Sequence, residues 1–141
     1  MGDGGKIEAL SAVTIGTRDM ARAVQFYENL GFRLCAGGPQ AEFTSFRAGP
    51  NFLNLAHVDA GILPAAGSGN GWGRLVFHVE DVDALYRHAV ACGFQPAAPP
   101  RDAEWGERFF HLTDPDGHEL SFARPLPAAS RSRTRGAEGE T

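Results

Sequence analysis

The stretch VTIGTRD at residues 13–19 recurs, with substitutions, as LVFHVED at residues 75–81. Each copy leads into a helical pattern that ends at a Gly-Phe pair, Gly31-Phe32 in the first half and Gly93-Phe94 in the second. The offset is 62 residues for both landmarks, because 81 − 19 and 93 − 31 give the same difference. Agreement of cap, apolar face, terminal glycine and following Phe indicates an internal duplication.

Each copy is typical of a strand that runs into a helix. Apolar residues alternate along the first segment, and the following Asp19 or Asp81 is a good N-cap because its carboxylate accepts from free backbone N–H groups. A glycine after the helical pattern can adopt the left-handed conformation that ends a helix. The apolar residues expected on the helix faces are Met20, Ala23, Val24, Tyr27 and Leu30, then Val82, Leu85, Tyr86, Ala89 and Cys92.

Three further strands are expected in each half, so the sequence predicts an α+β fold of two tandem βαβββ modules. Gly- and Pro-containing turns separate them, and Asp114-Pro-Asp-Gly117 is first of all a β-turn sequence. The expected strands are FRLCA (32–36), EFTSFRAG (42–49) and NFLNLAHV (51–58), then FQPAA (94–98), ERFFHLTD (107–114) and HELSFARP (118–125).

The boundaries follow from composition. Residues 1–7 are expected to be a flexible N-terminus and residues 8–125 a single domain, with module one at about 8–60, a linker at about 61–71 and module two at about 72–125. Residues 126–141 have almost nothing to bury and are expected to be a disordered tail.

Composition excludes several classes of function. The net charge of −4 comes without a Lys/Arg cluster interleaved with aromatic residues, so no nucleic-acid partner is expected. The start MGDGGKIEAL has no apolar targeting stretch and no run is long enough to span a membrane, so we expect a cytoplasmic protein. Cys35 and Cys92 are too few for a disulfide framework, and packed free thiols are expected.

The duplicated pattern, DMARAVQFYENLGF at residues 19–32 and DPDGHELSF at residues 114–122 together resemble the vicinal oxygen chelate superfamily, which includes glyoxalase I, extradiol dioxygenases and bleomycin-resistance proteins. Residues 10–27 and 105–117 look closest to the bleomycin-resistance branch, whose members sequester a drug without altering it. The resemblance implies a half-open mixed β-barrel around a ligand cavity, with the helices packed outside, and a homodimer.

The same resemblance implies four inward positions that hold a metal in the enzymes of the superfamily. In this sequence these positions are Ala12 and Arg74 on the first strand of each half, and Asn54 and Ser121 on the last. A catalytic metal needs about three imidazole, thiolate or carboxylate ligands, and none of these residues supplies one. No metal site and no cofactor are therefore expected, although histidines elsewhere leave a relocated metal as an alternative.

A cavity with aromatic walls and a few polar groups is what a small-molecule pocket needs. The candidate ligand-binding residues are Phe43, Ser45, Arg47, Asn54, Trp72, Arg74, His78, Trp105, Phe109, His111 and Ser121. For Phe43, Phe109 and the two Trp, plain core packing is an equal alternative. Arg74 either meets an anionic ligand or forms an internal ion pair with Glu119 or Glu107.

The leading hypothesis is a metal-independent protein that sequesters an aromatic antibiotic or metabolite. Bleomycin itself fits poorly, because the drug is cationic and this cavity presents Arg74 and Arg47. The alternative is an isomerase, lyase or dioxygenase-like enzyme with an absent or relocated metal, using His78 or His111 as base and Arg74 to hold an oxyanion. A structural or regulatory module is the least supported possibility.

Overall fold

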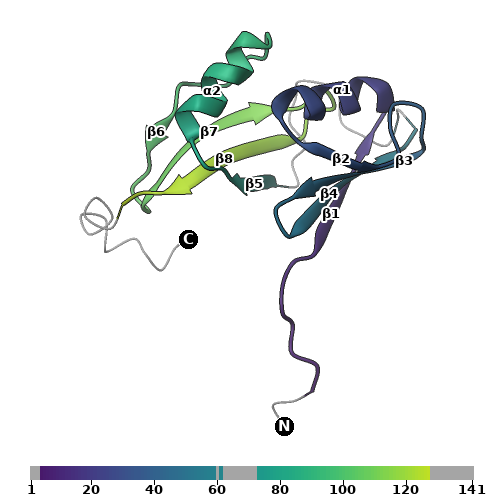
Figure 1. Cartoon of the computed structure of the whole chain (residues 1–141), viewed down its shortest axis with the longest axis horizontal. Coiled ribbons are helices and arrows are strands. Elements are labelled where there is room, and N and C mark those ends of the chain that lie inside the picture. The colour runs from purple at the N-terminus through teal and green to yellow at the C-terminus, as the bar shows by residue number, and fades with distance from the viewer. Residues whose placement is uncertain (1–3, 60, 62–72, 128–141) are drawn as a thin grey trace. The chain divides into compact units, whose positions relative to one another are not determined.

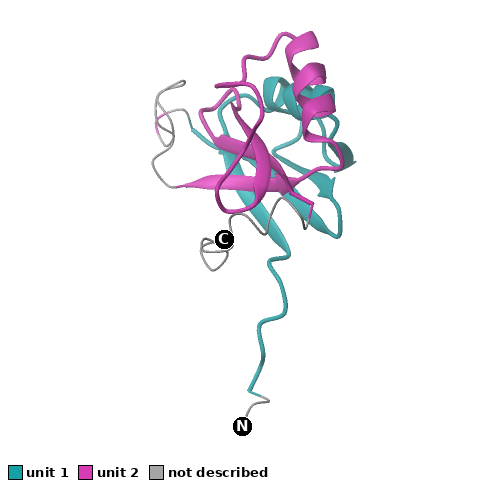
Figure 2. Ribbon diagram, turned by 90° about the vertical axis from the view of Figure 1, so that its left-hand side faces the viewer, with its two compact units in different colours: residues 1–60 teal, residues 61–141 magenta. Residues whose placement is uncertain are grey.

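The computed structural model describes residues 4–59, 61 and 73–127. The chain divides into two compact units, residues 1–60 and residues 61–141, which we call unit 1 and unit 2 (Figure 2). Most of the expected linker and tail, and Trp72 with them, lie outside the described residues. Each unit is described by itself below.

Unit 1 contains one helix and a four-stranded sheet (Figure 1). Its elements are β1 (Ala12–Thr17), α1 (Met20–Leu30), β2 (Arg33–Ala36), β3 (Phe43–Ala48) and β4 (Asn51–His57). The strand order is β1-β4-β3-β2, with β1 parallel to β4 and the other pairs antiparallel. Residues 4–11, before β1, are exposed and extend away from this sheet.

Unit 2 repeats the same topology. Its elements are β5 (Arg74–His78), α2 (Val82–Ala91), β6 (Arg101–Asp102), β7 (Glu107–Thr113) and β8 (Glu119–Pro125), in the order β5-β8-β7-β6. The predicted α+β architecture of two βαβββ modules is thus confirmed. Hydrogen bonds between the described strands stay within each unit, so the strands make two separate sheets that do not close into a barrel.

The helix ends follow the predicted chemistry. The side chain of Asp19 accepts from the backbone N–H of Arg22 at 3.1 Å, and that of Asp81 accepts from Ala84 at 3.0 Å. Gly31, with φ of 118°, lies in the left-handed region at the end of α1. In each unit, one Asp side chain thus caps the helix that follows the first strand.

One predicted strand is wrong. Residues 94–98 form no strand, and the shorter β6 begins only at Arg101. Pro96, Pro99 and Pro100 explain the shift, because proline has no N–H to donate to a ladder. One backbone bond, from the N–H of Ala97 to the carbonyl of His111, is all that this segment donates to β7 before β6.

Aromatic residues fill the space between each helix and its sheet. In unit 1, Tyr27 of α1 packs edge-on against Phe32 and contacts Phe46, with ring centroids 5.4 and 5.7 Å apart. In unit 2, Tyr86 of α2 packs against Phe110, which in turn contacts Phe122. These side chains bury the apolar helix faces that the spacing predicted.

The second helix buries less of its expected face than the first. Val82 and Ala89 are its buried residues, whereas Cys92 is exposed as the cap that follows the last turn. Cys35 is exposed as well, on the edge strand β2. Neither cysteine forms a disulfide, as predicted, but the prediction that the thiols are packed is wrong, because each lies at the margin of its unit.

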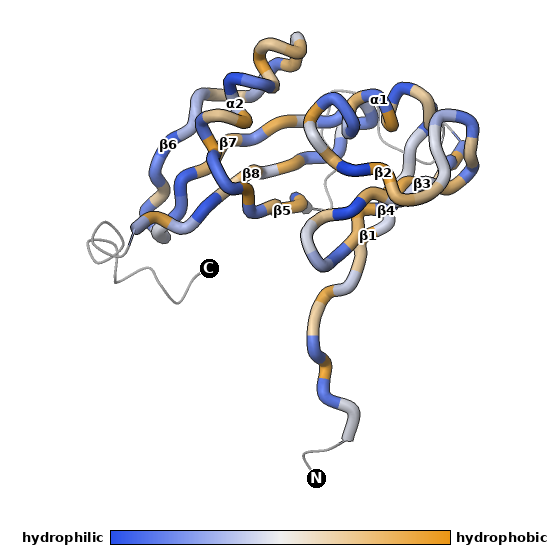
Figure 3. The backbone as a smooth tube through the Cα atoms, viewed as in Figure 1, coloured by the Kyte–Doolittle hydropathy of each residue, from blue (hydrophilic) through white to orange (hydrophobic). Residues whose placement is uncertain are grey.

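Side chains alternate between two faces of each sheet, and Figure 3 shows hydrophobic and hydrophilic positions alternating along the strands. One face packs against the helix of its unit, and we call the other the open face. The strand register shows which side chains share a face in each unit. The open face carries Thr14, Phe43, Ser45, Arg47, Phe52 and Asn54 in unit 1, and Arg74, Val76, His78, Glu107, Phe109, His111, Glu119 and Ser121 in unit 2.

Within the described ranges, no helix is both long enough and apolar enough to cross a membrane.

Candidate ligand-binding faces

The open face of unit 2 begins with an ion pair between neighbouring strands. Arg74 of β5 and Glu119 of β8 are register partners, and Nη2 of the arginine donates to Oε1 of the glutamate at 2.8 Å. This confirms the internal ion pair that the sequence left open for Arg74. Both side chains are about a third exposed, so the guanidinium keeps N–H donors that a ligand can reach.

Glu107 joins a histidine to a tryptophan on the same face. Its Oε2 lies 3.0 Å from Nε2 of His78, and its Oε1 accepts from the indole N–H of Trp105 at 3.0 Å. Both carboxylate oxygens are thereby engaged. The contact orients the Trp105 ring, which is 42% exposed.

Phe109 is the centre of a ring cluster. The indole of Trp105 stacks on it with centroids 5.7 Å apart, and the ring of His111 lies 4.9 Å away. Cζ of Arg101, the register partner of Phe109 on β6, lies 4.8 Å from the same centroid. Phe109 itself is only 5% exposed, so the reachable surface belongs to the groups around it.

His111 faces Ser121 across the β7–β8 ladder, with the serine hydroxyl oxygen 2.6 Å from Nδ1. Burial lowers the pKa of His111 below its ordinary value, and the nearby positive charges of Arg74 and Arg101 lower this pKa further. Glu119 opposes the shift. The imidazole is therefore neutral at pH 7.

The open face of unit 1 carries a neutral hydrogen-bonded chain across three strands. The hydroxyl of Ser45 on β3 donates to Oδ1 of Asn54 on β4 at 2.7 Å, and Nδ2 of Asn54 donates to Thr14 on β1 at 3.2 Å. Each group still has hydrogen-bonding capacity. The Asn54 amide has two N–H donors, and its carbonyl oxygen, like the hydroxyl oxygens of Ser45 and Thr14, has two lone pairs.

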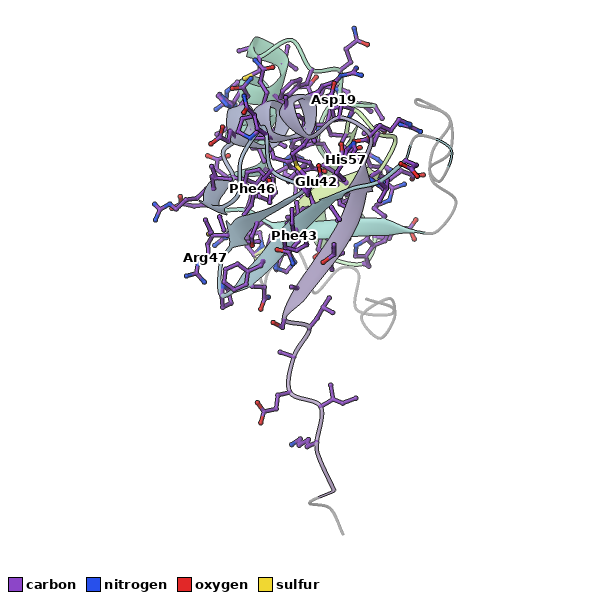
Figure 4. All side chains as sticks on the ribbon, turned by 90° about the vertical axis from the view of Figure 1, so that its right-hand side faces the viewer. Asp19, Glu42, Phe43, Phe46, Arg47 and His57 are labelled. Atoms are coloured by element: carbon purple, nitrogen blue, oxygen red, sulfur yellow. The ribbon has the colours of Figure 1, made fainter. Side chains whose placement is uncertain are left out.

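Two larger side chains of β3 flank these hydrogen-bonded groups. Phe43 is 50% exposed, and Arg47 lies over the Phe52 ring at 4.7 Å from Cζ to the centroid. Figure 4 shows Phe46 on the side where α1 lies, with Phe43 and Arg47 away from the helix. The open face of unit 1 thus carries an exposed ring and a cation.

The four positions that the family resemblance assigned to metal ligands carry side chains that are poor metal donors in the structure. Ala12 has no donor atom, and Arg74 is a cation already bound to Glu119. Asn54 and Ser121 are neutral and are engaged with Ser45 and His111 respectively. Within either unit, the described residues also bring no three His, Cys, Asp or Glu side chains together in a way that could hold a metal.

Ten of the eleven candidate residues predicted from the sequence lie within the described ranges, and the eleventh, Trp72, lies outside them. Four of these ten lie on unit 1, namely Phe43, Ser45, Arg47 and Asn54, and the other six lie on unit 2. The sequence analysis did not include Arg101 among the candidates, because it expected the strand after the second helix at residues 94–98 instead of at β6. The three prolines before Arg101 were the signal that could have moved that strand.

Comparison with known proteins gives the family context. A family model described as the Glyoxalase/Bleomycin resistance protein/Dioxygenase superfamily matches residues 9–122. A Mycobacterium tuberculosis protein named "Putative glyoxylase CFP32" is 36% identical over 85 residues, which are 57% of this chain and 32% of that protein. The chain therefore spans about a third of the length of this relative.

Solved structures share the fold at low identity. TioX from Micromonospora sp. ML1 matches with a TM-score of 0.68 and 24% identity, covering 84% of this chain and 100% of that one. A bleomycin resistance determinant encoded on transposon Tn5 gives 0.67 and 22%, covering 84% and 98%. Lactoylglutathione lyase from Agrobacterium tumefaciens gives 0.67 and 18%, covering 85% and 96%. A resistance determinant and a lyase both match, so the fold alone does not choose between their functions.

Proposed function

Because the chain belongs to the Glyoxalase/Bleomycin resistance protein/Dioxygenase superfamily, we propose that it is a metal-independent small-molecule-binding protein that sequesters an aromatic antibiotic or metabolite. The observation that carries the proposal is the state of the four family metal positions. One has no donor atom, and the other three, Asn54, Arg74 and Ser121, already bind protein groups. What remains on the open faces is rings and hydrogen-bonding groups, which suit binding.

The ring cluster supports a flat, partly aromatic ligand. Trp105 is exposed and is held by Glu107 and Phe109, so a ligand can stack on a ring that is already oriented.

We further propose that the protein acts in the cytoplasm and as a homodimer, the commonest symmetric assembly. Gel filtration with light scattering tests the dimer, and a monomer mass at micromolar concentration contradicts it.

The binding proposal is tested on full-length protein purified in EDTA. A library of planar aromatic antibiotics and metabolites is screened by thermal shift, and hits are measured by isothermal titration calorimetry. We expect some compounds to raise the melting temperature without metal and to be recovered unaltered by mass spectrometry. Trp105→Leu should weaken the hits, whereas Val90→Ala, at an exposed apolar position on α2, should not. A library without hits, or hits that require a divalent metal, contradicts the proposal.

A second candidate function is supported by the contact between Ser121 and His111. A neutral imidazole has the lone pair that a general base needs, so a metal-independent isomerase or lyase is the alternative. Incubation with the thiol adduct of an α-dicarbonyl compound tests it. Turnover that persists in EDTA and disappears in His111→Gln favours the enzyme, and no conversion favours binding alone.

A further inference from the structure

Arg101 is a cation on the margin of the open face of unit 2 without a carboxylate of its own. The two acidic side chains on that face are both engaged, Glu107 with His78 and Trp105, and Glu119 with Arg74. Among the described residues, Arg101 contacts the Phe109 ring and forms no ion pair. Its N–H groups are therefore available to an acceptor that the described chain does not supply.

His111, whose ring also lies next to Phe109, offers a second hydrogen-bond donor. The only hydrogen bond of Ser121's side chain among the described residues is the contact with Nδ1. If Nδ1 carried the proton, the serine O–H would have no acceptor, and a buried unsatisfied donor is costly. The serine therefore donates to Nδ1, and the neutral ring carries its proton on Nε2. That N–H has no protein acceptor within the described ranges.

Both donor groups lie beside the Phe109 ring. Arg101 Cζ lies 4.8 Å and the His111 centroid 4.9 Å from the Phe109 centroid, so they are at most 9.7 Å apart (4.8 + 4.9). A carboxylate that accepts one hydrogen bond of about 2.8 Å on each oxygen spans about 8 Å between its donors. Trp105 stacks on the same Phe109 ring, with centroids 5.7 Å apart, so an aromatic surface belongs to the same cluster as both donors.

We propose that Arg101 and the Nε2–H of His111 form an oxyanion subsite beside Trp105, and that the ligand class is a planar aromatic carboxylate or enolate. The inference rests on the proposed binding function and adds the charge of the ligand to it. Arg74 adds a second positive charge, partly neutralised by Glu119. The ring stacks on the indole, and the oxyanion accepts from the guanidinium and the imidazole.

The test uses three probes that share one ring system, namely 2-naphthoate, 2-naphthamide and 2-naphthylmethylammonium. Affinities for the full-length protein are measured by isothermal titration calorimetry at pH 7.5. We expect naphthoate to bind at least tenfold more tightly than naphthamide, and the cation to bind most weakly. Arg101→Gln and His111→Phe should each reduce the naphthoate preference to threefold or less while the naphthamide affinity holds in Arg101→Gln. Trp105→Leu should weaken all three probes.

Arg124→Gln is the matched control, because Arg124 is an exposed arginine of the same unit on the opposite face of β8. It should keep the full naphthoate preference. Equal binding of naphthoate and naphthamide by the wild type, or a preference that survives in the Arg101→Gln, His111→Phe double variant, overturns the inference and leaves the binding function standing. If no naphthalene probe binds and the aromatic library also gives no hits, both the inference and the proposed function fail.

Discussion

The side chains of His111 and Ser121 are joined by a contact of 2.6 Å between Nδ1 and Oγ, and the two residues are register partners in the β7–β8 ladder. In the superfamily's enzymes the position of Ser121 is expected to supply a metal ligand. In this chain the serine instead fixes the protonation of its neighbour, because its hydroxyl hydrogen needs an acceptor. A position expected to bind metal thus orients a hydrogen-bond donor in this chain.

Ser121→Ala should release this constraint. Without the hydroxyl donor on Nδ1, the neutral ring is no longer held in one tautomer, and the pKa of His111 should rise toward its ordinary value. Long-range proton–nitrogen NMR spectra of the imidazole measure both effects, and we expect the wild type to carry its proton on Nε2. The variant should lose about 0.5–1.5 kcal/mol of stability. A wild-type ring protonated on Nδ1 contradicts the assignment.

His111 should make the stability of the fold depend on pH. Its pKa in the folded protein is lower than the ordinary value of 6.5, because burial and the charges of Arg74 and Arg101 disfavour the imidazolium. The unfolded state therefore binds the proton more readily, so stability is complete above pH 6.5 and is lost as the pH falls through the folded pKa. Melting temperatures between pH 7.5 and 5 should fall less in His111→Gln than in the wild type. An equal fall in both proteins contradicts the link.

Removing one of the two positive neighbours tests the cause of that pKa. Arg101→Gln should raise the pKa of His111 toward its ordinary value, because it removes a charge that opposes the imidazolium. The histidine titration is followed by NMR, with Arg124→Gln as a control that leaves the midpoint unchanged. A midpoint that stays the same in Arg101→Gln would assign the shift to burial and Arg74 alone.

The duplicated elements could be predicted from the sequence because their signals are local. Asp19 and Asp81 cap helices through atoms three residues away, and period two along the strands placed Arg74 and His78 on one face. Partners across strands could not be predicted in this way. Glu119 and Glu107 were both acceptable partners for Arg74, and only the register of β5 against β8 selects Glu119.

Arg108 should hold α2 on its sheet. Its Nε and Nη2 donate to the two carboxylate oxygens of Asp83 on α2, both at 2.9 Å, and Nη1 donates to Asp102 on β6 at 3.0 Å. This hydrogen bonding lowers the pKa of Asp83. Lysine cannot reproduce the two-pronged contact, so Arg108→Lys should destabilise the protein. Because the groups are solvent-exposed, the loss should be about 1 kcal/mol or less.

Urea unfolding at low and high salt measures the contribution of Arg108. The difference between wild type and Arg108→Lys should shrink in 1 M salt, since exposed ion pairs are screened. Arg87→Lys, at an exposed position on the same helix, serves as the control. A loss that does not change with salt would indicate that the packing of the arginine stem matters more than its charge.

Phe46 and Phe43 lie on opposite faces of β3, which allows stability and binding to be separated on one strand. Phe46 is fully buried against Tyr27, so Phe46→Ala leaves a cavity and should cost about 3–5 kcal/mol. Phe43 is half exposed on the open face, so Phe43→Ala should change stability by about 0.5 kcal/mol or less. Urea unfolding gives both values, and calorimetry with library hits gives the affinity.

If Phe43 contacts the ligand, its variant weakens binding at nearly unchanged stability. A Phe43→Ala protein as unstable as Phe46→Ala would instead assign this ring to the core, the alternative that its sequence position left open.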